Sequence, residues 1–206
     1  QRARPAAPGR CKASFAGNGN SESARCADPM SSGGEGPIVV VVAGLGTFGI
    51  TLAEIYNEIF AKYCRSTGDC RPPSGAPFLP ATSVTVEQAR GFAAWLTRET
   101  GRVYRLPRDA EWKHAASIGG RDPFVEGFCR RESKGNGPVQ VVQGRMNSWG
   151  LINAIGNVAE LVDDGGRASV AGGSYRDESG QCNPGARKPY TGADPLVGFR
   201  LLRELD

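Results

Sequence analysis

The helical sequence pattern of this chain is confined to its first part. Amphipathic stretches occupy residues 51–63, 85–101 and 109–117, whereas glycine, asparagine and short apolar alternations dominate from Gly119 to Asp206. Helices and strands that occupy separate parts of a sequence are typical of α+β domains rather than of alternating α/β domains. With 206 residues, 39% of them apolar, the chain is long enough to bury one core. The sequence therefore predicts a single α+β domain.

Local signals place the first elements. The β-branched run 38–43 predicts a buried strand, followed by a turn or bulge at 44–49. Thr51 and Glu54 have the spacing of a capping box, and an apolar stripe follows them to Tyr63. These residues predict a first helix that begins at Thr51.

The later elements are marked by their ends. Thr85 and Gln88 predict the start of a second helix, and Gly101 its end. A third, short helix is expected over 109–117. Strands are then expected in the second part of the chain, at residues 140–143, 168–171 and 197–202.

Six cysteines are present, and none of them forms a CxxC motif, so zinc-ribbon and thioredoxin signatures are absent. Their order favours local pairs, Cys11 with Cys26 and Cys64 with Cys70, which leaves Cys129 with Cys182. Six cysteines allow 15 connectivities, so this pairing is a preference. Three disulfides would place the chain in an oxidising, extracytoplasmic compartment. Six free thiols in a cytosolic protein are the alternative.

Other classes of protein are disfavoured by charge and composition. His114 is the single histidine, so a metal site built on imidazoles is not expected, and its surroundings predict a helical residue. The net charge is +4 without a basic stripe, which argues against a nucleic-acid partner. The longest apolar run, residues 38–46, is shorter than the roughly 20 residues of a membrane span. No membrane insertion is expected.

Several motifs in a fixed order resemble the formylglycine-generating (sulfatase-modifying factor) family, over roughly residues 36–203. The motifs are Ala94-Trp95-Leu96, Gly101–Pro107 with Ala110-Glu111-Trp112, Gly156–Leu161, Gly172–Tyr175 and Gly198-Phe199-Arg200. The resemblance implies a C-type-lectin-like variant of the α+β class, irregular and rich in loops. It also divides the chain into an irregular N-terminal arm, residues 1–36, and a domain of residues 37–206.

The resemblance assigns structural roles to most of the motif residues. It implies buried side chains at Tyr104, Leu106, Trp112, Leu151 and Phe199. A buried guanidinium must be paired, so Arg105 and Arg200 are expected to contact carboxylates or carbonyls. Glu111 and Glu160 are the candidate partners.

The residues that carry the family's chemistry are only partly present. Members that make formylglycine resemble one another in two cysteines, two and seven residues after the aromatic residue of the GGS motif, whose thiolates bind copper(I). Counted from Tyr175, these positions are Asp177 and Cys182. A carboxylate is a hard ligand and a poor substitute for a thiolate on copper(I). Copper and the oxygen-dependent reaction are therefore not expected, and the chain is interpreted as a non-enzyme.

Calcium is a further cofactor that the resemblance implies. Family members often bind it near the segment that corresponds to Gly156–Glu160, and oxygen ligands suit this ion. Asn157 and Glu160 are the residues retained here. The alternative is that Asn157 forms a turn and Glu160 pairs with an arginine.

The sequence thus favours a non-catalytic module that binds a protein or glycan, in an extracytoplasmic bacterial setting. The resemblance places the binding surface around the GGS motif and the following loop, because loops on a rigid base often carry recognition. The candidate residues are Trp149, Ser174, Arg176, Asp177, Glu178, Gln181 and Tyr190. Two alternatives remain: an enzyme with altered chemistry at Cys182 and Asp177, and a self-assembling structural subunit.

Overall fold

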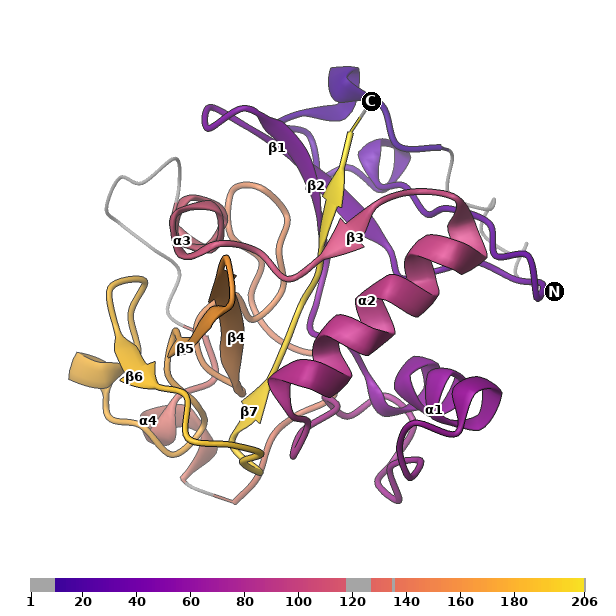
Figure 1. Cartoon of the computed structure of the whole chain (residues 1–206). Helices are drawn as coiled ribbons and strands as arrows, with labels where there is room; N and C mark the ends of the chain where they lie inside the picture. The colour runs from indigo at the N-terminus through magenta and orange to yellow at the C-terminus, as the bar shows by residue number, and fades with distance from the viewer. Residues whose placement is uncertain (1–9, 118–126, 135, 206) are drawn as a thin grey trace, which may run out of the picture.

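A computed structural model describes residues 10–117, 127–134 and 136–205 (Figure 1). Its α-helices in these ranges are α1 (Asn57–Thr67), α2 (Val86–Thr100), α3 (Asp109–Ala116) and α4 (Arg130–Ser133). Its strands are β1 (Val39–Ala43), β2 (Thr47–Thr51), β3 (Tyr104–Arg105), β4 (Ala159–Asp164), β5 (Arg167–Ala171), β6 (Arg187–Pro189), β7 (Val197–Gly198) and β8 (Leu202–Glu204). One sheet has the order β1-β2-β8-β3, and the other β6-β5-β4-β7. The longer helices lie in the first part of the chain, which confirms the α+β class.

Strand β1 is buried on both faces and divides the core. Val39 and Val41 belong to one hydrophobic cluster, whereas Val40 and Val42 belong to a second. Because successive side chains of a strand point to opposite faces, a continuous apolar run fits a strand covered on both sides. The first cluster includes residues of α1 and α2, and the second includes residues of α3.

Aromatic side chains join α1 and α2. Phe60 of α1 lies 5.6 Å from Phe92 of α2 and 5.9 Å from Phe199, measured between ring centroids. Such spacings are typical of favourable aromatic pairs. All the side chains that were expected to be buried are buried here: Tyr104, Leu106, Trp112, Leu151 and Phe199.

The ends of α2 confirm the sequence prediction. Gln88 N donates to Thr85 Oγ1 at 3.1 Å, and Thr85 N donates to Gln88 Oε1 at 3.0 Å, which together form a capping box. Gly101 follows the helix with φ +66°, in the left-handed region that glycine adopts without a steric penalty.

The predicted start of the first helix at Thr51 is wrong. Thr51 ends β2, where it pairs with Val39, and α1 begins six residues later, at Asn57. The expected cap partner Glu54 is buried and accepts a hydrogen bond from Asn157 instead. The apolar stripe alone did not reveal the boundary, because its first members, Leu52 and Ile55, are buried in non-helical chain before α1.

Three other local predictions need correction. Strand β2 begins at Thr47, so the turn expected over 44–49 is shorter. Residues 140–143 form a turn, in which Gln143 N donates to Gln140 O at 2.8 Å, rather than a strand. The strand expected over 197–202 is split: β7 belongs to one sheet and β8 to the other. The connecting residues cross between the sheets, along the yellow segment of Figure 1.

Residues 10–36 are irregular, apart from short 3₁₀ turns, and are packed against the remainder of the chain. Asp28 is buried, and its carboxylate accepts hydrogen bonds from Arg203 Nε at 3.0 Å and from the Tyr104 hydroxyl at 2.8 Å. A buried carboxylate needs such partners to offset its lost hydration. The domain boundary expected at residue 36 stays a prediction.

The preferred cysteine pairing is confirmed. Disulfides join Cys11 to Cys26, Cys64 to Cys70 and Cys129 to Cys182. Such bonds persist in oxidising compartments, so they indicate an extracytoplasmic environment. Within the described ranges, the helices are all too short or too polar to cross a bilayer.

Candidate functional site

The loop between β5 and β6 starts with two glycines that the backbone requires. Gly172 and Gly173 have φ values of +89° and +77°. A Cβ atom at Gly173 would lie 2.5 Å from the carbonyl oxygen of Gln181 and 2.9 Å from the Cα of Cys182. Any other residue there is therefore strained and blocked by backbone, which explains the GGS motif in physical terms.

The carboxylate of Asp177 is buried inside this loop and joins its two sides. Its Oδ2 accepts hydrogen bonds from the backbone N and the hydroxyl of Ser174, both at 2.8 Å, and its Oδ1 pairs with Lys188. Burial acts to raise the pKa of the Asp177 carboxyl, but the hydrogen bonds from Lys188 and Ser174 outweigh burial and lower the pKa. Asp177 is therefore a charged structural residue of the loop.

The Cys129–Cys182 disulfide holds the other end of the loop. Both cysteines are fully buried, and α4 follows Cys129 directly. The segments are also joined by Arg130 N, which donates to Asp177 O at 3.1 Å, and by the Ser133 hydroxyl, which donates to Tyr175 O. The residues at the two copper positions of the family thus do not fit copper(I), because neither offers a thiolate.

The outer side of the loop is polar and exposed. We define the loop surface by its exposed side chains, Arg176, Glu178 and Gln181. Arg176 lies over the ring of Tyr175 at 5.6 Å, and Glu178 forms an exposed ion pair with Arg130 at 3.3 Å. A cavity of about 180 Å³ borders this surface, between Gln181 and residues of β5 and β6.

Not all the predicted binding residues lie together. Five of them fall in the β5–β6 loop, namely Ser174, Arg176, Asp177, Glu178 and Gln181. Tyr190 follows β6, and its hydroxyl accepts a hydrogen bond from Val86 N at the start of α2. Trp149 lies elsewhere, with its ring 5.8 Å from that of His114 on α3. Ligand binding by these residues stays a prediction.

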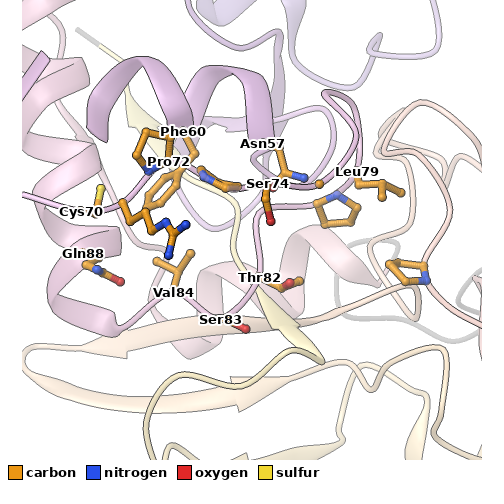
Figure 2. A pocket seen from close by; sticks show the side chains of 15 residues that line it. Asn57, Phe60, Cys70, Pro72, Ser74, Leu79, Thr82, Ser83, Val84 and Gln88 are labelled. Atoms are coloured by element: carbon orange, nitrogen blue, oxygen red, sulfur yellow. The ribbon is translucent and has the colours of Figure 1, made fainter. Parts of the chain in front are cut away.

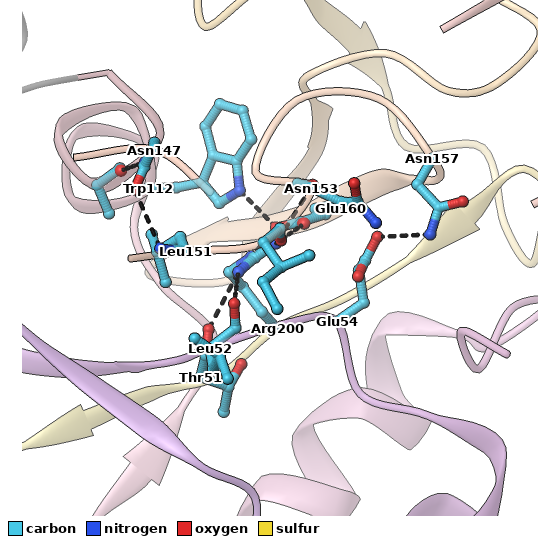
Figure 3. A network of polar contacts seen from close by, with 12 residues as sticks. Thr51, Leu52, Glu54, Trp112, Asn147, Leu151, Asn153, Asn157, Glu160 and Arg200 are labelled. Carbon is cyan, nitrogen blue, oxygen red and sulfur yellow. Dashed lines mark hydrogen bonds and ion pairs between the residues drawn. The ribbon is translucent and has the colours of Figure 1, made fainter. Parts of the chain in front are cut away.

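A buried polar network connects the two sheets (Figure 3). Arg200 donates to both carboxylate oxygens of Glu160, at 2.7 and 2.6 Å, and to the carbonyl oxygens of Thr51 and Ile152. Trp112 Nε1 donates to Glu160 Oε2 at 2.6 Å. Arg200 and Glu160 are each 1% exposed, so this is the arginine–carboxylate pair that was expected. The other candidate partner, Glu111, pairs with Arg105 and accepts two hydrogen bonds from it at 2.7 Å.

Asn157 lies beside this network and joins Glu54 to the loop (Figure 3). It has φ +58° and is fully buried. Its side chain donates to Glu54 Oε1 at 2.9 Å and accepts from Val139 N, while its carbonyl oxygen accepts from Tyr175 N in the GGS segment. Burial raises the pKa of the Glu54 carboxyl to about 8, although Arg200 acts to lower it.

Asn157 and Glu160 do not offer free oxygens to calcium. Asn157 Oδ1 accepts from Val139 N, and both Glu160 oxygens accept from Arg200. The buried side-chain oxygens without a hydrogen-bond partner in the described residues include Glu54 Oε2 and Asn153 Oδ1. Calcium binding at Asn157 and Glu160 stays a prediction, and it requires the present donors to be displaced.

The raised pKa of Glu54 predicts a pH-dependent stability. Between pH 4.5 and about 8, folded Glu54 holds a proton that the unfolded chain has released, so the free energy of unfolding falls as pH rises across this range. A Glu54→Gln variant lacks this titration. Its stability relative to the parent protein should rise by at least about 1 kcal/mol between pH 5 and pH 8, as measured by urea denaturation.

The matched control is Glu58→Gln, which changes an exposed acid of α1. Because the Glu58 side chain is exposed, this variant should change the free energy of unfolding by less than about 0.5 kcal/mol. A stability difference between Glu54→Gln and the parent protein that is the same at pH 5 and pH 8 would contradict the assignment of a protonated Glu54.

A separate pocket of about 580 Å³ lies between α1, the 71–84 segment and the start of α2 (Figure 2). Prolines line much of it, with Ser74, Thr82 and Gln88 as neutral polar groups and Arg71 as the charged residue. Asn57 Nδ2 fixes one wall by donating to Ala76 O at 3.0 Å. No acid, histidine or free thiol is among the described residues that line it, so these residues offer no general acid or base.

Sequence reasoning missed two residues of the candidate site. Lys188 neutralises Asp177, and the guanidinium of Arg187 lies 5.0 Å from the ring centroid of Trp112. Both come from β6, a strand of three residues that is too short to show a recognisable strand pattern in the sequence. No local spacing connects Lys188 to a partner eleven positions earlier.

Solved structures with the same fold come from several proteins. PvdO from Pseudomonas aeruginosa has a TM-score of 0.67 at 21% identity, over 88% of this chain and 91% of that protein. Treponema denticola variable protein 1 has a TM-score of 0.71 at 18% identity, over 88% and 99%. CarF has a TM-score of 0.55 at 23% identity, over 78% and 87%. At these identities the likeness shows the fold, which confirms the expected C-type-lectin-like scaffold.

Sequence comparison gives the family. No curated protein sequence matches the chain significantly. The family model described as the sulfatase-modifying factor enzyme 1-like domain matches residues 45–205, which include α1, α2, the buried Glu160–Arg200 pair and the GGS loop. The chain therefore belongs to the sulfatase-modifying factor enzyme 1-like family.

Proposed function

We propose that this domain is a non-catalytic, extracytoplasmic binding module that recognises a protein partner through the loop surface. The observation that carries the proposal is that the two positions at which the family has copper-binding thiolates, Asp177 and Cys182, here form bonds that hold the loop. Cys182 is joined to Cys129, and Asp177 is joined to Ser174 and Lys188. Both positions serve to fix the loop, so the scaffold keeps its shape without the family's copper chemistry.

The loop surface has features that suit recognition. Arg176, Glu178 and Gln181 are exposed, whereas the backbone beneath them is held by Gly173, Asp177 and the disulfide. A rigid base lowers the entropy that a loop loses when it binds. The mixed charges and the adjoining cavity favour polar contacts to a protein.

The extracytoplasmic setting rests on the three disulfides, and the similar folds of proteins from Pseudomonas aeruginosa and Treponema denticola support a bacterial host. Periplasmic, secreted and cell-surface locations all agree with this proposal. Fractionation of the source cells, followed by detection of the protein with an antibody, distinguishes them.

The catalytic part of the proposal is tested with a cysteine-containing sulfatase peptide. The unreduced protein is incubated with this peptide, copper(I) and oxygen, and the peptide is analysed by mass spectrometry. We expect unmodified cysteine. Conversion to formylglycine at a rate above that of copper alone would contradict the proposal.

The binding part is tested with a matched pair of double variants. Arg176→Ala with Glu178→Ala changes the loop surface, and Arg65→Ala with Glu58→Ala removes the same charges from the exposed side of α1. Biotinylated proteins are incubated with proteins and glycans released from the outside of source cells. Loss of a specific protein only with the loop variant supports the proposal, whereas equal capture by both variants, or capture of glycan alone, contradicts it.

A further inference from the structure

A cavity of about 590 Å³ lies on the side of α2 that faces β3 and the β4–β5 turn. It shares no lining residue with the loop surface or with the pocket of Figure 2. Its wall contains Arg90 and Arg98 of α2, Arg105 of β3 and the following Arg108, with Asp163 of β4 as the acidic residue. The four arginines outnumber this aspartate and the two glutamates that pair with Arg105, Glu111 and Glu204, so the cavity keeps a net positive charge.

The arginines differ in how far they are already neutralised. Arg105 pairs with Glu111 and with Glu204, and Arg90 Nε pairs with Asp163 at 2.8 Å. Arg98 and Arg108 are exposed and form no ion pair with any residue that the structure describes. These two guanidinium groups are therefore available to an anion.

One donor in the wall also lacks an acceptor. Arg90 Nη2 is buried and has no hydrogen-bond partner among the described residues. A buried donor on a charged group that makes no hydrogen bond costs free energy. A small shift of the Arg90 side chain toward a bound anion would remove this cost.

The base of the cavity is apolar. Ala93 of α2 and Leu106 after β3 are buried and line it, together with the buried Tyr104. Ala94 also lines the cavity and is exposed, so a ligand that fills the cavity gains apolar contact as well as ion pairs. A nucleic acid or a sulfated glycan would instead use an extended basic stripe with polar contacts.

We propose that this cavity binds an acidic peptide segment of a partner protein. Carboxylates of the peptide pair with Arg98 and with Arg108, and a neighbouring apolar side chain packs on the exposed Ala94 of the wall. Arginine is suited to this role because its planar guanidinium binds a carboxylate through two parallel hydrogen bonds. The site is independent of the loop surface, so either proposal can fail without the other.

The test uses the full chain and a fluorescein-labelled decapeptide in which glutamate alternates with leucine and phenylalanine. Binding is followed by fluorescence anisotropy. The Arg98→Glu/Arg108→Glu double variant should bind at least tenfold more weakly than the parent protein. The control Lys62→Glu/Arg65→Glu makes the same change of charge on the exposed side of α1 and should bind as the parent does. Circular dichroism verifies that both variants are folded.

Two further probes make the assignment specific. A decapeptide with the same glutamates and glycine in place of leucine and phenylalanine should bind at least fivefold more weakly, since it lacks the apolar contact. A sulfated oligosaccharide of equal charge should not compete. Equal weakening by both double variants, equal affinity for the glycine peptide, or stronger binding of the oligosaccharide would overturn the proposal.

Discussion

Replacing Cys129 and Cys182 together with alanine should lower the free energy of unfolding by about 4 kcal/mol. This disulfide closes a loop over a sequence separation of 53 residues, and in the chain-entropy model the stabilisation grows with loop length. It also joins the start of α4 to the loop that Asp177 closes, so its loss should free the loop surface. Urea denaturation gives the loss of stability, and amide exchange of residues 174–182 gives the loss of order.

The matched control is the Cys64→Ala/Cys70→Ala variant, which removes a disulfide with a separation of six residues. The same model gives it about 2 kcal/mol. Equal losses in both variants would argue against loop closure as the source of stability. Titration of the denatured, unreduced parent protein should find no free thiol, and a reactive Cys182 would return the enzyme hypothesis to consideration.

The second large effect is expected at the buried pair of Glu160 and Arg200. A Glu160→Gln variant leaves the guanidinium of Arg200, 1% exposed, without a counter-charge, and should lower the free energy of unfolding by about 3–5 kcal/mol. The Glu160→Gln/Arg200→Met double variant should lose less than the sum of the two single variants, because no lone charge remains in the core.

The comparison for this pair is Arg90 with Asp163, an ion pair of similar length whose arginine is 39% exposed. An Asp163→Asn variant should lose less than about 1 kcal/mol, since solvent screens an exposed pair. Urea denaturation of Asp163→Asn and Glu160→Gln at the same pH gives the two losses of stability to be compared. Similar losses at Asp163 and Glu160 would mean that burial does not set the strength of the central pair.

The Glu160–Arg200 prediction concerns contacts that lie apart from the GGS loop. The Glu160–Arg200 pair joins the sheets through the carbonyl oxygens of Thr51 and Ile152, and the nearby Asn157 joins Glu54 to the GGS loop. None of these contacts involves Asp177 or Cys182. A family member that lacks the thiolate pair can therefore keep the fold.

The sequence by itself determined those features that depend on residues close to one another along the chain. Thr85 and Gln88 specify the start of α2 three residues apart, and Gly101 specifies its end. The cysteine order favoured the pairs that formed. Family motifs in a fixed order added the scaffold and the buried partner of Arg200. Such signals are readable because local backbone geometry brings these residues together in many contexts.

Only the tertiary structure decided the rest. Glu54 has the spacing of a helix cap, yet it is buried and accepts a hydrogen bond from Asn157, 103 positions later. Helix α1 begins only at Asn57. Lys188 meets Asp177, and Arg98 and Arg108 line one cavity, because packing of the helices and sheets brings separate elements side by side. Contact between distant residues depends on the whole core, and burial then fixes which charges are neutralised and which remain available.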